Sequence, residues 1–553
     1  MDARTSELLL PEHEGLAGGD RPPELRQERD KHLTLLQLCL DRFRDDAVIV
    51  SDDRGHRWAG LTQKSVSNPD TGLENNARDV VGSLPGIFPE WLGNRDFGQV
   101  LDCRFPYVCG EMARGIASPE MVIEAVKAGF AGFFGSAGLR VPVVRDAILS
   151  IREAVGENTA WGMNLIHSPD RPERETELVD LFLAEGVANV SASAFMRLSK
   201  DVVRFSAAGL HVSGTGGIVR KTRVFAKISR PEVASAFLLP PPEKMLAALV
   251  QDGAITEQQA ELQRRLPVAE FITVEADSGG HTDGRPLGAL FPAIRETLDR
   301  AVERYGYDRP VFLGAAGGIG TPAAVASAFA IGADYVLTGS INQASVEANL
   351  SDDAKAMLCE ADVADIALAP AADMFEIGAK VQVLKKGTLF ATTGQRLDAL
   401  YRRYQSLDEL PARDREWVEK KVLRQPFDAA WAETRAYHAR NKPDLVARAD
   451  TNDKLKLALV FKRFLFLGSQ WARDGNADRR LDYQVWCGPA MGAFNTWAHG
   501  TFLAEAQNRT VRQIGLNLLE GATRITRAQQ LRSCGVAVPA HMMTFRPVRL
   551  ELG

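Results

Sequence analysis

Two glycine-rich segments with small hydroxyl residues lie in the middle of the chain, at Gly317-Gly318-Ile319-Gly320-Thr321 and at Thr338-Gly339-Ser340. Each follows a short apolar run that is typical of a buried strand. Backbone N–H groups in such loops can approach phosphate oxygens, and a helix that starts behind them adds partial positive charge. The two segments therefore predict a phosphate-binding site. The alternative is that their glycines only form turns and start helices.

A histidine follows another apolar run, in Asp277-Ser278-Gly279-Gly280-His281. An imidazole titrates near neutrality and can donate or accept a proton. The two preceding glycines let the backbone approach a ligand closely. His281 is therefore the strongest candidate for acid–base chemistry. The alternative is that it packs on a bound group or caps the next helix.

The elements that position these residues alternate between short apolar strands and helical stretches, which indicates βαβ units. Eight such alternations close near residue 340 and predict an α/β fold of the (β/α)₈ barrel type, with function on the loops that follow the strands. The expected strands are Phe105–Cys109, Gly132–Phe134, Trp161–Ile166, Asn189–Ser191, Val224–Ile228, Ile272–Glu275, Val311–Ala315 and Tyr335–Leu337.

We expect three parts of the chain. Residues 1–80 form a partly disordered N-terminal extension with one helix near Leu33–Phe43 and a strand at Val48–Val50. Residues 81–350 form the barrel, with a helical insertion at 229–271 that covers its mouth. Residues 351–553 supply the last barrel helix and a helical cap that binds substrate.

A competing interpretation is the nucleotide loop of short-chain dehydrogenases, because the segment 314–320 fits G-x-x-x-G-x-G. Those enzymes use a Tyr-x-x-x-Lys pair, in which the lysine lowers the tyrosine pKa. None of the eight tyrosines has a lysine four residues later. We therefore reject this interpretation.

The composition is that of an ordinary globular protein: 553 residues, 45% hydrophobic, 25% charged, net charge −5. This balance predicts no nucleic-acid or membrane partner, and we expect a cytoplasmic protein because the first residues lack a secretory apolar core. The six cysteines form no cluster with histidine, so we expect reduced thiols and no metal site.

Longer stretches of the sequence resemble a known family. The barrel segments are similar to the nitronate monooxygenase and FMN enoyl reductase superfamily. From about Val81 to about residue 535, the chain resembles the PfaD-type trans-acting enoyl reductases of polyunsaturated fatty acid and polyketide synthases. The matching stretches are Ser83–Pro85, Pro89–Gly93, Asn164–Pro169, Glu275–Asp283, Ala369–Glu376 and Trp486–Asn495. The chain departs from the family at Gly284 and Arg114. Both residues flank the expected active site, so the departure bears on the shape of the substrate more than on the type of reaction.

The resemblance implies a bound FMN, with NADPH or NADH as hydride donor, and an α,β-unsaturated thioester on an acyl carrier protein as substrate. Met112 and Ala113 would lie near the reactive flavin edge, and Asn164 would bind the pyrimidine end unless it is a strand-end cap. Lys227 would place positive charge near N1, unless it is a rim lysine exposed at its tip. The expected cofactor-binding residues are Glu111, Met112, Ala113, Asn164, Lys227, Asp277, Ser278, Gly279, Gly280, Gly317, Gly318, Ile319, Gly339 and Ser340.

In this scheme His281 is the catalytic residue, which protonates the enolate or polarises the thioester carbonyl. The alternatives are a nitronate monooxygenase, which uses oxygen instead of NADPH, and a non-catalytic flavin-binding component of a synthase. The sequence leaves a homodimer open. Basic stretches at 451–480 and 523–550 suit docking of an acidic carrier protein, or they are ordinary solvated helix faces.

Overall fold

The chain divides into two compact units in the computed structural model, which describes residues 23–62, 79–156, 158–169 and 171–551. The small unit contains Met1–Phe88 and Arg524–Thr544. The large unit contains Pro89–Thr523 and Phe545–Gly553.

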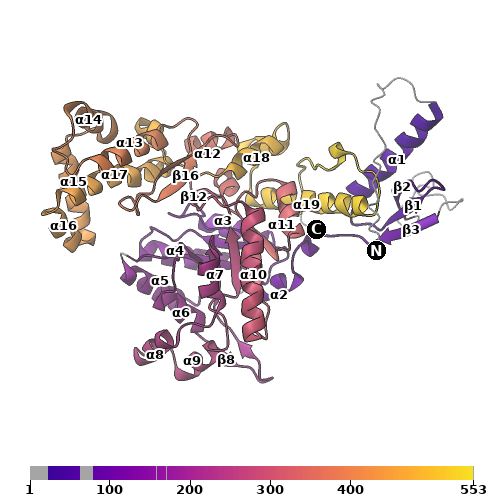
Figure 1. Cartoon of the computed structure of the whole chain (residues 1–553), viewed down its shortest axis with the longest axis horizontal. Helices are drawn as coiled ribbons and strands as arrows, with labels where there is room; N and C mark the ends of the chain where they lie inside the picture. The colour runs from indigo at the N-terminus through magenta and orange to yellow at the C-terminus, as the bar shows by residue number, and fades with distance from the viewer. Residues whose placement is uncertain (1–22, 63–78, 157, 170, 552–553) are drawn as a thin grey trace, which may run out of the picture. The chain divides into compact units, whose positions relative to one another are not determined.

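The large unit is built on a closed barrel of eight parallel strands (Figure 1). The barrel closes where β14 pairs with β4, with Thr338 opposite Cys109. The predicted barrel is confirmed, and each strand lies within two residues of its expected bounds. In chain order the strands are β4 (Tyr107–Cys109), β5 (Ala131–Phe134), β6 (Trp161–Ile166), β7 (Asn189–Ser193), β10 (Arg223–Ile228), β11 (Phe271–Glu275), β13 (Phe312–Ala316) and β14 (Tyr335–Thr338).

Helices that connect the strands surround the barrel (Figure 1). Their starts follow ordinary capping chemistry: Ser118 Oγ accepts from Met121 N ahead of Pro119, and Thr321 Oγ1 accepts from Ala324 N. The helices are α2 (Arg95–Leu101), which precedes β4, then α3 (Pro119–Lys127), α4 (Val141–Val155), α5 (Pro172–Ala184), α6 (Lys200–Ala207), α7 (Pro231–Leu238), α10 (Leu287–Tyr305) and α11 (Pro322–Ala330).

The inside of the barrel is aromatic at the start of the strands and charged at their carboxyl ends. The rings of Phe225 and Phe271 stack with centroids 4.1 Å apart, and Phe271 stacks on Phe312 at 5.0 Å. Alternate residues of a strand share a face. Lys227, two residues after Phe225, and Glu275, four after Phe271, therefore also point inward. The packed floor fixes the strands, and the polar layer above it is available for chemistry.

The insertion between β10 and β11 lies away from the barrel mouth. Its helices α8 (Glu243–Gln251) and α9 (Glu257–Gln263) pack against α6, where Ser206 Oγ donates to Gln263 Oε1 at 3.2 Å. Figure 1 shows them beside β8 (His211–Val212), at the end of the barrel opposite β12 (Gly280–His281). The expectation that this insertion covers the mouth is wrong, because its apolar side chains are buried against the outside of the barrel.

No single helix among the described residues is long and apolar enough to cross a membrane. Helices α7 and α8 taken together are long and apolar enough, but α8 is bent by 52° relative to α7.

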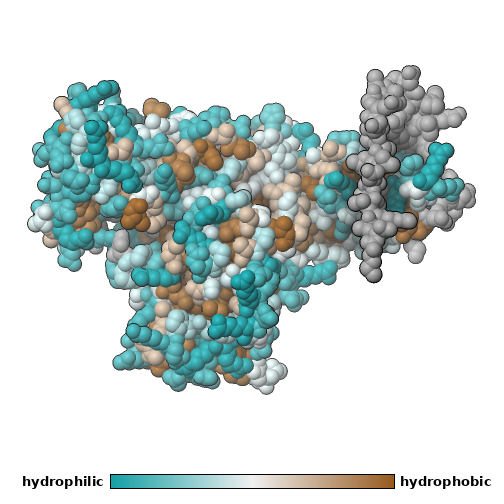
Figure 2. Space-filling model, in the orientation of Figure 1, coloured by the Kyte–Doolittle hydropathy of each residue, from teal (hydrophilic) through white to brown (hydrophobic). Residues whose placement is uncertain are grey.

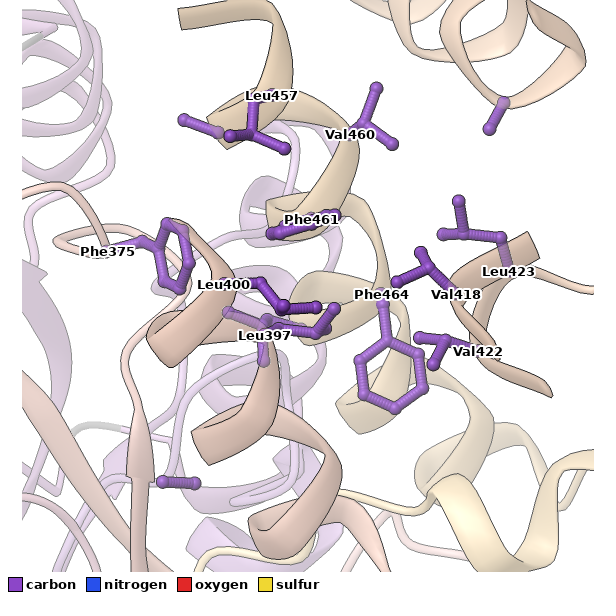
Figure 3. Packing of buried hydrophobic residues seen from close by; sticks show 14 of the residues in the cluster. Phe375, Leu397, Leu400, Val418, Val422, Leu423, Leu457, Val460, Phe461 and Phe464 are labelled. Atoms are coloured by element: carbon purple, nitrogen blue, oxygen red, sulfur yellow. The ribbon is translucent and has the colours of Figure 1, made fainter. Parts of the chain in front are cut away.

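The C-terminal part of the large unit contains a helical subdomain, which we define as residues 390–474. Figure 3 shows its core, where Leu397 and Leu400 meet Phe461 and Phe464 beside Val422. The subdomain contains α13 (Phe390–Arg403), α14 (Ala412–Trp417), the π-helix η5 (Val418–Leu423), α15 (Phe427–Asn441), α16 (Pro443–Ala449) and α17 (Asp453–Asp474). Around it lie α12 (Asp352–Cys359), α18 (Pro489–Ala498) and an antiparallel sheet of β12, β16 (Lys380–Leu384) and β15 (Ile366–Pro370).

The small unit joins the two ends of the chain. Strands β1 (Ala47–Ser51), β2 (Arg57–Leu61) and β3 (Asp79–Leu84) form an antiparallel sheet with β1 in the centre. The last turns of α19 (Val511–Ser533) complete it: Arg527 is fully buried, and its Nη2 donates to the carbonyls of Phe43 at 3.1 Å and of Pro85. Helix α1 (Pro23–Asp41) occupies part of the extension expected to be disordered, whereas residues 1–22 lie outside the described residues.

The basic stretch at 451–480 is largely neutralised by ion pairs. Lys462 pairs with Glu376 at 2.8 Å and Arg463 with Glu433 at 2.7 Å. Arg473 and Arg479 likewise pair with Asp474 and Asp482. The face of the molecule drawn in Figure 2 carries hydrophilic residues with hydrophobic ones dispersed among them. The positive charge expected from the sequence is therefore largely compensated by acids outside this segment, Glu376, Glu433 and Asp482.

Candidate functional site

A buried ionic network lies at the carboxyl ends of β4, β10 and β11. Lys227 Nζ is 3.3 Å from Glu111 Oε1 and 3.0 Å from Glu275 Oε1. The Lys227 and Glu111 side chains are 12% and 4% exposed. Charges removed from water in this way must be paired, so the three side chains hold one another in position.

The pairing changes the expected role of Lys227. Burial lowers the pKa of Lys227, but the two carboxylates outweigh burial and raise it. Burial raises the pKa of Glu111, which Lys227 only partly offsets, and no described group hydrogen-bonds to Glu111 Oε2. Lys227 is thus a neutralised member of a network. It is neither a rim lysine nor a free positive charge.

The amide of Asn164 is also engaged by the protein. Its Nδ2 donates to Ser193 Oγ at 2.8 Å and to Ser191 O at 3.1 Å, and it lies 3.5 Å from Glu111 Oε1. The backbone carbonyl of Asn164 accepts from Ser136 Oγ. Asn164 lies inside β6 and therefore ties β6 to β7 next to the ionic network.

The loops after β13 and β14 have the geometry of a phosphate cradle. Gly317 has φ +87°, and an added Cβ there would lie 2.6 Å from the backbone of Ala276, so only glycine fits. An added Cβ at Gly318 or Gly339 would meet no atom within 4 Å. Both glycines thus border open space, while Ile319 between these loops is buried.

The Asp277–Gly280 loop reaches the same place. Gln382 Nε2 donates to Asp277 Oδ1 at 3.1 Å, and Ser278 Oγ donates to Glu275 Oε1 at 3.4 Å. An added Cβ at Gly279 would lie 2.9 Å from Ser340 Oγ. The three glycine loops are therefore adjacent at one end of the barrel, as their positions after strands predict.

A late segment of the chain, Trp486 to Gly488, closes over these loops. Gly488 N donates to Ser340 Oγ at 3.2 Å, and an added Cβ at Gly488 would lie 2.8 Å from Gly279 N. Gln343 Nε2, in the 3₁₀ helix η4 (Ser340–Ala344), donates to Trp486 O at 2.5 Å. Glycine at both 279 and 488 permits this close backbone approach.

His281 lies in β12, where it pairs with Val381 of β16. Its Nε2 is 3.1 Å from Asp373 Oδ1, and its side chain is 38% exposed. Burial lowers the pKa of His281, but the hydrogen bond and charge of Asp373, with Glu275, outweigh it and raise the pKa above its ordinary value. The pair is thus an imidazole oriented by a carboxylate and reachable from solvent, which is an arrangement suited to proton transfer.

Met112 and Ala113 follow β4 in a loop held against the end of β5. Met112 O accepts from Ala117 N at 3.2 Å, and an added Cβ at Gly135 would clash with the same carbonyl. The loop is therefore fixed by close backbone packing. It shares the barrel end with the ionic network through the adjacent Glu111.

Three residues of the site were missed in the sequence: Glu275, Asp373 and Gln382. Glu275 ends β11 and Asp373 follows β15, and both lie inside stretches that carry the family resemblance. Their partners are distant in sequence, since His281 and Asp373 are 92 residues apart. For Glu275 and Asp373, the stretches that resemble the family were therefore the only signal in the sequence.

The residues present fit FMN. Gly318 and Gly339 leave room for a phosphate that a side chain would fill, and η4 and α11 start directly behind them. The polar layer of Glu111, Asn164 and Lys227 suits the polar edge of a flavin. The Met112 loop lies on the side of this layer nearest β5.

The chain is similar to proteins of polyketide and polyunsaturated fatty acid biosynthesis. It is 43% identical over 434 residues to polyketide biosynthesis protein PksE of Bacillus subtilis, covering 78% of this chain and 56% of that protein. It is 42% identical over 477 residues to one component of the polyunsaturated fatty acid synthase of Thraustochytrium sp., covering 84% of this chain and 32% of that protein. The chain thus spans about a third to somewhat more than half of these relatives.

Two further similarities concern the fold. The crystal structure of the enoyl reductase domain of MlnA, from the macrolactin biosynthesis cluster of Bacillus amyloliquefaciens, is 38% identical with a TM-score of 0.77. The match covers 80% of this chain and 99% of that domain. Residues 404–483 match the family of the inserted helical domain of acyl-carrier-protein S-malonyltransferase.

Proposed function

The chain is an enoyl reductase of the family that includes the domain of MlnA, and from this premise we propose that it binds FMN and acts in trans on carrier-bound thioesters. An α,β-unsaturated acyl thioester, NADPH and a proton would give the saturated thioester and NADP⁺. The observation that carries the proposal is the His281–Asp373 pair at the barrel end that holds the three glycine loops.

The chain's own residues have distinct tasks in this reaction. FMN, when bound, supplies the hydride chemistry. Gly317, Gly318 and Gly339 would hold its phosphate, and the Glu111–Lys227 network would position its polar edge. His281, whose pKa Asp373 raises, would donate a proton to the α-carbon or hydrogen-bond the thioester carbonyl.

Anaerobic mixing tests this function. The purified protein should be yellow and should release about one equivalent of FMN on precipitation. NADPH should bleach it, and an enoyl thioester should restore the colour. In a separate aerobic assay, consumption of a nitronate and oxygen without NADPH would indicate the monooxygenase. A protein that shows neither this consumption nor reoxidation by enoyl thioester would be a non-catalytic flavin protein.

Replacing Gly339 with valine should remove FMN without unfolding the protein. The side chain added at Gly339 would enter open space, which the phosphate would occupy. We expect FMN to bind at least about tenfold more weakly, because a phosphate that accepts several N–H bonds loses its cradle. Fluorescence titration with FMN measures this.

The matched control is Gly214→Val, since Gly214 also borders open space but lies next to the hairpin of β8 and β9 (Ile218–Val219). Equal FMN affinity in Gly339→Val and the wild type would contradict the phosphate site.

Replacing Asp373 with asparagine should shift the pH profile of reoxidation by enoyl thioester. Asp373 raises the pKa of His281, so its removal lowers that pKa. A proton donor is active below its pKa, and the alkaline limb of the profile should therefore move to lower pH. Bleaching by NADPH should be unaffected, and an unmoved alkaline limb would show that Asp373 does not position His281.

The helical subdomain would serve as the substrate-binding cap, and residues 404–483 match a domain inserted in an enzyme that acts on acyl carrier protein. Since ion pairs neutralise most of the 451–480 stretch, docking would rely on shape more than on charge. Carrier-bound substrate should outperform a simple thioester and lose little with added salt.

A further inference from the structure

Arg114 connects the loop after β4 to the helical subdomain. Its guanidinium lies 3.9 Å from the ring centroid of Phe466 in α17, and its backbone N donates to Ala137 O at 2.8 Å. Arg114 adopts φ +61°, a left-handed conformation that is unfavourable in a residue with a side chain. The chain therefore holds an arginine in a strained position where the family resemblance predicts a small polar residue.

The charge of Arg114 has no carboxylate partner. Within the described ranges, no Asp or Glu oxygen lies within 4 Å of its guanidinium, and the nearby Asp474 is bonded to Arg473 Nε at 2.8 Å. Burial, and then the charge of Arg473, lower the pKa of Arg114 to about 10, so it remains a cation at neutral pH. Two guanidinium groups near one carboxylate leave an excess of positive charge, which an anion would relieve.

Arg114 lies beneath the same face of α17 as the acid–base pair. Lys462 Nζ contacts Asp373 O at 3.5 Å and pairs with Glu376, while Phe466 contacts Arg114. Lys462 and Phe466 are four residues apart, about 6 Å along the helix and on one face. Phe466 is still 42% exposed. A ligand that reaches His281 under α17 would pass close to Arg114.

We propose that Arg114 binds a phosphate group of a substrate that enters beneath α17. Guanidinium binds phosphate through its edge and can stack its face on an aromatic ring at the same time. The phosphate comes from the phosphopantetheine arm of the carrier or from the 2′-position of NADPH. This inference rests on the proposed function, which supplies both ligands.

Calorimetry on the FMN-loaded protein separates the two sources. The probes are 4′-phosphopantetheine against pantetheine, and adenosine 2′-phosphate against adenosine. In the wild type, one of the two phosphate compounds should bind about tenfold more tightly than the same compound without its phosphate. A tenfold difference corresponds to roughly 1.4 kcal/mol, which is the effect of one charge-assisted contact at a partly exposed site. Arg114→Gln should abolish that advantage, and Arg114→Lys should keep part of it.

Arg463→Gln is the matched control, because Arg463 lies in α17 near Phe466, the residue that contacts Arg114, but is paired with Glu433. It should keep the full phosphate advantage. Absence of any phosphate advantage in the wild type, or its survival in Arg114→Gln, would overturn the inference. A wild-type protein that reduces no enoyl thioester would refute the proposed function, whereas the binding comparison would still decide whether Arg114 binds phosphate.

Discussion

His281→Ala is expected to slow reoxidation of the NADPH-bleached enzyme by enoyl thioester roughly 10²-fold, while FMN content and bleaching stay unchanged. A general acid contributes about 10²–10⁴-fold, and water can partly replace one that is 38% exposed, so the lower end of this range applies. Bleaching needs only close approach of the nicotinamide to the flavin. Gly279 and Gly280, together with the other glycine loops, would continue to hold the cofactor.

Rapid mixing of the two half-reactions separately provides the measurement. His211→Ala is the control, since His211 is an exposed residue of β8, in the hairpin between α6 and β10. If His281→Ala slowed both half-reactions equally, His281 would position the flavin instead. An unchanged second half would mean that the proton comes from another group.

Lys227→Met is expected to destabilise the protein by about 3–5 kcal/mol, because it leaves Glu111 and Glu275 buried without their cation. Urea unfolding at constant FMN concentration measures the loss. Lys420→Met is the control, since the pair of Lys420 and Glu416 is exposed and its loss should change stability little.

The loss of stability in Lys227→Met should depend on pH in a defined direction. Burial raises the pKa of Glu111 in the folded state. A raised folded-state pKa contributes stability at low pH that is lost as pH rises through it. The loss in Lys227→Met should therefore be smaller near about pH 5 than near about pH 8. Adding Glu111→Gln should recover part of it, and a pH-independent loss with no recovery would contradict the buried network.

The barrel was predictable because its strands are short and apolar and alternate with helices, some of which begin with recognisable capping residues. Ser118-Pro119 and Thr321-Pro322 mark helix starts through local chemistry alone. The glycine loops were predictable for the same reason, since a residue directly after a strand must lie at the barrel's carboxyl end.

Features that depend on distant partners were not predictable. The sequence shows Lys227 at a strand end but not the two carboxylates that neutralise it. It shows seven basic residues in 451–480 but not the acids, such as Glu376 and Glu433, that pair with them. The insertion at 229–271 was misplaced because its length gives no information about which side of the barrel it covers.

The closure of the small unit by α19 has a consequence for protein synthesis. The bond from Arg527 to Phe43 joins residues 484 positions apart. At about 5–20 residues per second, a ribosome needs roughly half a minute to a minute and a half to make that span. Throughout this time the sheet of β1, β2 and β3 lacks the helix that covers Leu36 and Ile49. Nascent chains should therefore depend on holding chaperones at their N-terminal segment until the last part of the chain has emerged.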